Sequence, residues 1–204
     1  MINNDIKILW EPSRRRIKDS NITAFIEAVN LDWNTKIEGF EELYEFSIKE
    51  PENFWQSLIQ FSGVIAETWG NNVLKNPKEM PGAVWFPDAK LNYAENLLRR
   101  RDDADALVFW GEDKVKLRFS HNELYCEVSR IAQALRASGI VAGDRVVGYM
   151  PNMPQTIIAM LAAASLGAIW SSCSPDFGVL VYWIDLVKSN PKCYLFVTAI
   201  FIMV

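Results

Sequence analysis

The feature that most constrains the fold lies in the second half of the chain, where the spacing of apolar residues changes repeatedly between helical spacing and short continuous apolar runs. The spacing of apolar residues alternates between two kinds over four segments: 120–138, 146–150, 152–166 and 168–173. The first and third have helical spacing, the second and fourth are short apolar runs, and turn residues separate them. The order helix, strand, helix, strand predicts an α/β fold with buried parallel strands.

The boundaries of these elements carry their own signals. Ser120 and Glu123 have the spacing of a capping box, and Gly139 is the kind of residue that ends a helix, so a helix is expected from Ser120 to about Ser138. The uncharged segment 156–166 is shorter than the roughly 20 apolar residues that span a bilayer. We therefore expect a helix packed on a sheet and no membrane span.

Several motifs in and before this stretch resemble those of a known enzyme family. The motifs are Leu-Trp-Glu-Pro-Ser (9–13), Glu-Asn-Phe-Trp (52–55), Trp-Phe-Pro-Asp-Ala-Lys-Leu-Asn-Tyr-Ala-Glu-Asn-Leu-Leu (85–98), Leu-Arg-Phe-Ser-His-Asn-Glu-Leu (117–124) and Leu-Gly-Ala-Ile-Trp-Ser-Ser-Cys-Ser-Pro-Asp-Phe-Gly (166–178). Together they resemble the adenylate-forming acyl-CoA synthetases, and the last is similar to the version found in the acetoacetyl-CoA synthetase branch.

The resemblance implies a helical N-terminal extension over residues 1–100, as in acetyl-CoA synthetases, and the first part of the AMP-binding lobe over residues 101–179. Within these parts, Ser20 is expected to cap one helix and Pro51 to begin another, while Asp88 is expected to cap a helix running to Leu98. Segments 106–110 and 115–119 are expected to form a hairpin with one face in water.

Composition excludes several classes of function. The net charge of −4 gives no basic surplus for nucleic acid, and the polar, acidic start of the chain is unlike a signal peptide. The three cysteines are too scattered for a disulfide framework or a metal site, which favours the cytoplasm. The single histidine, His121, lies in a helix cap, so a catalytic role for it is not expected.

Members of the resembled family join a carboxylate to ATP with magnesium, release pyrophosphate, and pass the acyl group to CoA. The resemblance implies small-molecule substrates, with acetoacetate as the acid. However, the sequence lacks the Ser/Thr/Gly-rich loop ending in Pro-Lys, the Thr-Gly-Asp segment, and a GxxxxGK[ST] loop. We therefore expect no catalytic or metal-binding residue here, and an isolated chain that is inactive and binds these ligands poorly.

One group of residues is expected near the active site. By resemblance, five consecutive residues end a central strand close to the acyl and CoA tunnel, where ligands bind in open α/β sheets: Trp170, Ser171, Ser172, Cys173 and Ser174. Judged by chemistry alone, small hydroxyl groups could either line such a channel or simply end the strand. Cys173 is not expected to be a nucleophile, because no base is paired with it.

The tail, residues 180–204, departs from the resembled family. Family members continue with Gln-Gly-Val-Leu-Asp-Arg-Phe-Gly-Gln-Ile-Glu-Pro-Lys and a strand Val-Leu-Phe, whereas this chain reads Leu-Val-Tyr-Trp-Ile-Asp-Leu-Val-Lys-Ser-Asn-Pro-Lys-Cys-Tyr-Leu-Phe over 180–196. Codons for this reading, shifted by one base, can encode the family segment. The hypothesis is therefore a frame-shifted tail on a truncated enzyme; a divergent C-terminus is the alternative.

The α/β pattern also occurs in two other classes of protein. A non-catalytic α/β module could bind a partner through the helical extension and the apolar tail. A dinucleotide-binding dehydrogenase domain is excluded, because no GxGxxG motif follows any candidate strand.

Overall fold

The computed structural model describes residues 9–112, 114–177 and 191–196. The chain divides into two compact units, Met1–Lys90 and Leu91–Val204, which are described in turn. The expected α/β class, with helices first and a parallel sheet later, is confirmed.

The first unit is built mainly from helices. They are α1 (Arg14–Lys18), α2 (Asn21–Trp33), α3 (Phe40–Lys49) and α4 (Pro51–Ser62), followed by the short antiparallel pair β1 (Leu74–Lys75) and β2 (Val84–Trp85). Two expected helix starts are confirmed. Ser20 Oγ accepts a hydrogen bond from the Thr23 amide at 3.3 Å, and Pro51 occupies the first turn of α4.

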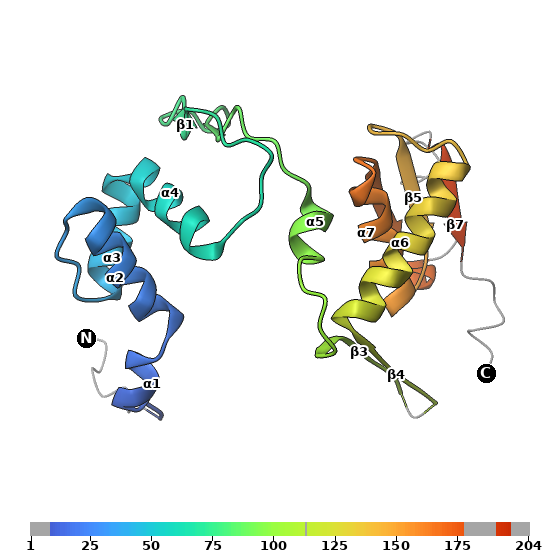
Figure 1. The fold of residues 1–204 in the computed structure, drawn as a ribbon, viewed down its shortest axis with the longest axis horizontal. Coiled ribbons are helices and arrows are strands. Elements are labelled where there is room, and N and C mark those ends of the chain that lie inside the picture. The colour runs from blue at the N-terminus through green and yellow to red at the C-terminus, as the bar shows by residue number, and fades with distance from the viewer. Residues whose placement is uncertain (1–8, 113, 178–190, 197–204) are drawn as a thin grey trace, which may run out of the picture. The chain divides into compact units, whose positions relative to one another are not determined.

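Helices α2, α3 and α4 are shown in Figure 1. Aromatic and aliphatic side chains hold them together. Phe25, Val29, Ile37 and Leu43 are buried, and the ring of Phe25 meets the ring of Phe54 edge to face at 5.6 Å.

One polar side chain, Ser57, is also buried in this unit, with 2% of its surface exposed. Its hydroxyl accepts a hydrogen bond from Trp33 Nε1 at 2.8 Å and donates one to Asp32 Oδ2 at 3.1 Å. The buried hydroxyl is therefore satisfied, and it ties α4 to the last turn of α2.

The predicted helix start at Asp88 is wrong. The helix α5 (Tyr93–Leu97) begins later and is capped by Asn92, whose Oδ1 accepts the Glu95 amide at 3.1 Å. Asp88 instead accepts a hydrogen bond from Asn72, and the next residues are held by a bridge between Thr68 and Lys90. Because residues 88–90 take part in these loop contacts, the helix cannot begin there.

The second unit contains a three-stranded parallel sheet, in the order β6-β5-β7. Strands β5 and β7 are labelled in Figure 1. Its elements after α5 are β3 (Asp105–Gly111), β4 (Val115–Ser120), α6 (His121–Ala137), β5 (Arg145–Tyr149), α7 (Pro154–Ser165), β6 (Ile169–Cys173), the 3-10 turn η1 (Pro175–Phe177) and β7 (Cys193–Phe196). The predicted helix, strand, helix, strand order is confirmed.

The capping box that opens α6 is also confirmed. Ser120 Oγ accepts the Glu123 amide at 3.2 Å, and Glu123 Oε2 accepts the Ser120 amide at 2.8 Å. The helix ends at Ala137, one residue before the predicted end.

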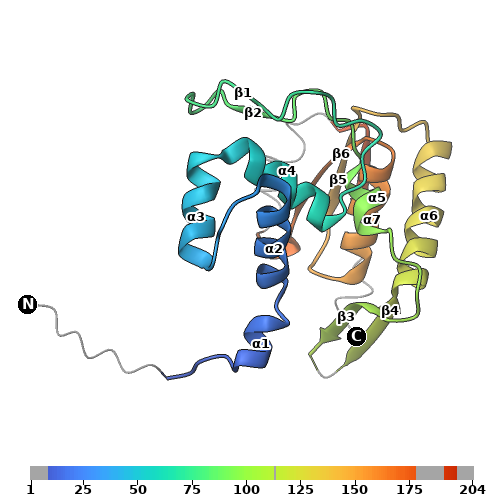
Figure 2. The same cartoon turned by 60° about the vertical axis from the view of Figure 1, so that its left-hand side comes forward.

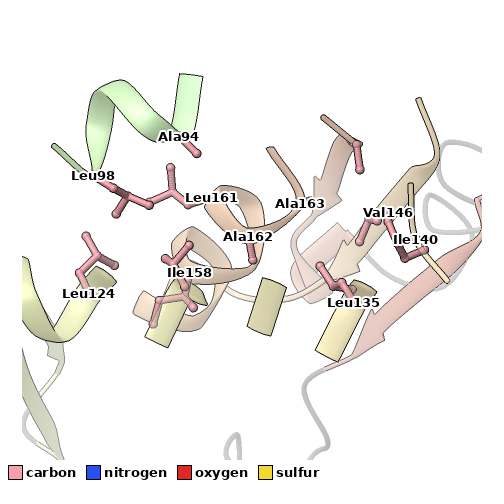
Figure 3. Close-up of a cluster of buried hydrophobic side chains, with 12 residues drawn as sticks. Ala94, Leu98, Leu124, Leu135, Ile140, Val146, Ile158, Leu161, Ala162 and Ala163 are labelled. Atoms are coloured by element: carbon pink, nitrogen blue, oxygen red, sulfur yellow. The ribbon is translucent and has the colours of Figure 1, made fainter. Parts of the chain in front are cut away.

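The core of the second unit lies where α5, α6 and α7 meet one face of the sheet. Figure 3 shows Ala94 of α5 and Leu98, the residue after α5, beside Leu161 of α7, and Leu135 of α6 near Val146 of β5. Leu161 and Val146 are 1% and 0% exposed. The absence of charge in segment 156–166 thus follows from its burial on several sides.

Strands β3 and β4 form the predicted antiparallel hairpin (Figure 2). Leu107 and Phe119 pack against the core, whereas the opposite face carries Val108 paired with Arg118 and Trp110 paired with Lys116. This outward face is exposed, as the alternation of apolar and basic residues in 115–119 predicts.

Most of the predicted aberrant tail, at 180–190 and 197–204, lies outside the described residues. Its described part contains β7, which pairs in parallel with β5. Lys192, just before this strand, donates from Nζ to Asp144 Oδ2 at 2.8 Å and to the Gly139 carbonyl at 2.7 Å.

Candidate functional site

The five residues expected near the active site lie in β6 and directly after it, beside β5. Strand register aligns Trp170 with Val146 and Cys173 with Tyr149, so both strands run in the same direction and end at the same edge of the sheet. This carboxyl edge is where open α/β sheets bind ligands.

Trp170 lies on the core face of the sheet, because it shares that face with Val146 and packs against the core cluster. Its indole crosses over Gly148 of β5. A Cβ atom at Gly148 would lie 2.6 Å from Trp170 Cη2 and 2.8 Å from Cζ2. The glycine therefore makes room for the ring, which packs against the core cluster.

The hydroxyl and thiol side chains divide between the two faces. Ser172 follows Trp170 by two residues and shares its face, whereas Ser171 and Cys173 point to the opposite face. Ser171 and Ser172 are exposed, and Cys173 is half-buried. The five residues therefore do not form a single continuous lining; only the carboxyl edge brings both sets together.

Residues after the strand ends fix the shape of this edge. The Met150 amide donates to the Cys173 carbonyl at 3.1 Å, and the Tyr149 hydroxyl donates to the Pro175 carbonyl at 3.2 Å. Ser174 Oγ donates to Asp176 Oδ2 at 2.8 Å. Sequence reasoning missed Tyr149, although its place at the end of a predicted central strand could have marked it.

The other reactive side chains lie away from this edge. Cys126 is exposed on α6, and Cys193 packs against the core, where burial raises the pKa of its thiol. Among residues 9–112, 114–177 and 191–196, no group of three or more His, Cys, Asp or Glu side chains is placed to hold a metal ion. In the same residues, no helix has both the length and the apolar character needed to cross a membrane.

Two family models match the chain. The acetyl-coenzyme A synthetase N-terminus matches residues 40–97, and the AMP-binding enzyme family matches residues 94–180. The candidate edge, with all five predicted residues, falls within the second match.

Curated relatives and a solved structure agree with these models. The acetoacetyl-coenzyme A synthetase of Rhizobium meliloti is 47% identical over 170 residues, which are 83% of this chain and 26% of the relative. The acetoacetyl-CoA synthetase of Macaca fascicularis is 39% identical over 86% of this chain and 26% of its own length. The structure of acetoacetyl-CoA synthetase from Streptomyces lividans matches 93% of this chain and 30% of that one, with a TM-score of 0.84 and 36% identity.

The chain thus spans about a quarter of the length of the curated relatives it matches. The two family models together match residues 40–180, and the chain is homologous to the N-terminal part of the acetoacetyl-CoA synthetases.

Proposed function

We propose that this chain supplies the N-terminal part of an acetoacetate–CoA ligase, an enzyme that converts acetoacetate, ATP and CoA into acetoacetyl-CoA, AMP and pyrophosphate through an acyl-adenylate. The observation that carries the proposal is the agreement of sequence and fold with one branch of the family. Identity reaches 47% with a bacterial acetoacetyl-coenzyme A synthetase, and the fold matches another at a TM-score of 0.84.

ATP, magnesium and CoA would be the ligands of the complete enzyme. The residues present in this chain do not fit ATP and magnesium, because the phosphate-binding loop and the Thr-Gly-Asp segment are absent from the sequence. The described carboxylates also form no cluster suited to a metal ion. We therefore assign no step of adenylate formation to this chain and expect it to be inactive alone in the cytoplasm.

The contribution that we propose for this chain is to shape the region near the acyl and CoA tunnel. Trp170 would act by packing, since its ring fills the space above Gly148 and sets the position of the strand end. Ser171, Ser172, Cys173 and Ser174 would border the tunnel from both faces of the carboxyl edge, with the exposed Ser171 and Ser172 offering hydroxyl groups to a ligand.

A chimera tests the proposed function directly. Residues 9–177 would replace the matching segment of the Rhizobium meliloti synthetase, and pyrophosphate release would be measured with ATP, CoA and acetoacetate. We expect the chimera to retain acetoacetate-dependent activity and the 204-residue chain alone to show none. A soluble, folded chimera without activity would refute the proposal, as would activity of the chain alone.

Ser172→Ala and Ser172→Leu in this chimera test the proposed tunnel. Removing one hydroxyl is expected to change the KM for CoA or acetoacetate by less than about tenfold, since a single hydrogen bond contributes about 0.5–1.5 kcal/mol. The leucine, which adds bulk at an exposed position, is expected to raise KM further. Unchanged kinetics in both variants would place Ser172 outside the tunnel.

A further inference from the structure

Tyr149 lies at the centre of the carboxyl edge of the sheet. It is the last residue of β5, in register with Cys173 at the end of β6 and with Phe196 at the end of β7. Strands β5 and β6 are labelled in Figure 2. Side chains alternate along a strand, so Tyr149 shares the face of Cys173, opposite to that of Trp170. The tyrosine therefore stands on the face of the edge that is turned away from the core cluster.

The hydroxyl of Tyr149 joins β5 to the turn that follows β6. It donates a hydrogen bond to the carbonyl oxygen of Pro175 at 3.2 Å, and the two residues are 26 positions apart in the chain. Pro175 begins the 3-10 turn η1, directly after Ser174. The bond is partly buried, so water competes with it less than at an open surface. The phenol thus fixes the direction that the chain takes after the strand.

Two other hydrogen bonds hold the same region, but they act at different points. The Met150 amide donates to the Cys173 carbonyl at 3.1 Å, which fixes the last residue of β6. Ser174 Oγ donates to Asp176 Oδ2 at 2.8 Å, which fixes the shape of the turn itself. The first bond acts before Ser174 and the second acts within the turn. Of these three bonds, the one from Tyr149 holds the turn against a neighbouring strand.

The position of this turn affects the border that we propose for the tunnel. Ser174 is covalently linked to both Cys173 and Pro175, so a displacement of Pro175 also displaces Ser174. Groups that position a substrate must keep their place closely, because a displacement of about 1 Å can weaken binding or slow the reaction strongly. The Tyr149 hydroxyl is therefore placed to influence binding at the edge without touching a ligand.

We propose that Tyr149 is a positioning residue, which holds the turn after β6 through its hydroxyl and so sets the affinity of the carboxyl edge for acetoacetate or CoA. The inference rests on the proposed function. In this role the hydroxyl transfers no proton and contacts no reacting atom. Its loss weakens binding of the ligand that passes the edge, and leaves the use of ATP and the turnover of the bound complex nearly unchanged.

Tyr149→Phe in the Rhizobium meliloti chimera removes only the hydroxyl. We expect the KM for CoA, for acetoacetate or for both to rise about two- to tenfold, the effect of one hydrogen bond. The kcat and the KM for ATP should change by less than about twofold, since uniform binding is lost and not transition-state stabilisation. A variant with only a loosened fold would instead reduce the amount of active enzyme, which lowers kcat and leaves every KM unchanged.

Tyr93→Phe is the matched control. It removes the hydroxyl of a tyrosine on α5 that is 57% exposed and lies outside the carboxyl edge. All three KM values and kcat should equal those of the parent chimera. The control thus separates the position of the lost hydroxyl from the change of tyrosine to phenylalanine.

Hydrogen exchange in the complete 204-residue chain tests the positioning without any activity. Two amides report on it: that of Met150, which donates to the Cys173 carbonyl, and that of Asp176, which donates to Ser174 Oγ at 3.4 Å. Tyr149→Phe should speed exchange at both by about two- to tenfold, because the turn opens locally more often. Exchange within α6 should stay the same.

Several outcomes would overturn the inference: unchanged exchange at Met150 and Asp176, a fall in kcat without a rise in any KM, or an equal effect of Tyr93→Phe. An inactive parent chimera would remove the proposed function, and with it the role of the turn in binding. An active parent chimera whose Tyr149→Phe variant keeps all three KM values would leave the proposed function standing and remove only the positioning role of Tyr149.

Discussion

The structure predicts a steric clash and a loss of stability for the substitution Gly148→Ala. The new methyl group would lie 2.6 Å from Trp170 Cη2 and 2.8 Å from Cζ2, whereas nonbonded carbons prefer about 3.5–4.0 Å. The ring must therefore move by about 1 Å, and it is a rigid, half-buried indole packed against the core.

The expected cost follows from two opposing effects. Overpacking of a core costs about 1–3 kcal/mol, and replacing glycine by alanine recovers about 0.4–1 kcal/mol by restricting the unfolded chain. The net prediction is a loss of about 1–2 kcal/mol. Urea unfolding followed by hydrogen exchange of the β5 amides would measure it, because this readout reports on the second unit alone.

A second substitution tests whether the Trp170 ring is the cause of this loss of stability. Trp170→Phe removes the two ring atoms that the new methyl group would meet. In that background Gly148→Ala should be neutral or slightly stabilising, which gives a coupling energy of about 1–2 kcal/mol. An equal loss of stability in both backgrounds would show that the indole is not the obstacle and that the packing described for this edge is wrong.

Three further predictions concern other parts of the chain. Ser57→Ala should destabilise the first unit by about 0.5–1.5 kcal/mol in urea unfolding, because it leaves the half-buried Trp33 Nε1 without its acceptor. The hydrogen bond from Lys192 holds the pKa of Asp144 below its ordinary value, so its stabilisation is present above the unfolded-state pKa and is lost as pH falls through the folded one. Asp144→Asn should therefore lower the melting temperature at neutral pH and have no effect in strong acid. Sequencing the coding DNA past the codon for Gly178 should show that a one-base shift restores the family segment; an unshifted frame would favour a divergent C-terminus.

Elements with short-range signals could be predicted from the sequence. The capping box at Ser120 and the proline at Pro51 each specify a helix start through neighbours within one turn. The apolar run at 146–150 specifies a buried strand because a central parallel strand is covered on both faces. In each case the local chemistry and the tertiary environment favour the same structure.

Features that depend on distant residues could not be predicted. Asp88 and Asn92 are both good caps, and the choice between them depends on contacts with Asn72 and Thr68 in an earlier loop. Ser57 looks like a surface residue until its tryptophan partner, 24 residues away, is known. At the candidate edge, the sequence indicated the strand end, but the division of its side chains between two faces needed the register with β5.

Strand β7 shows that an edge strand of a sheet needs only a few kinds of side chain. Central strand β5 has a partner on each side, and the second partner, β7, lies in the segment that we expect to be frame-shifted. Cys193 and Leu195 meet the core, while Lys192 reaches back to Asp144. A lysine followed by four apolar residues meets these demands. Pairing at this edge therefore depends on backbone hydrogen bonds and on apolar side chains facing the core, and less on which apolar side chains these are.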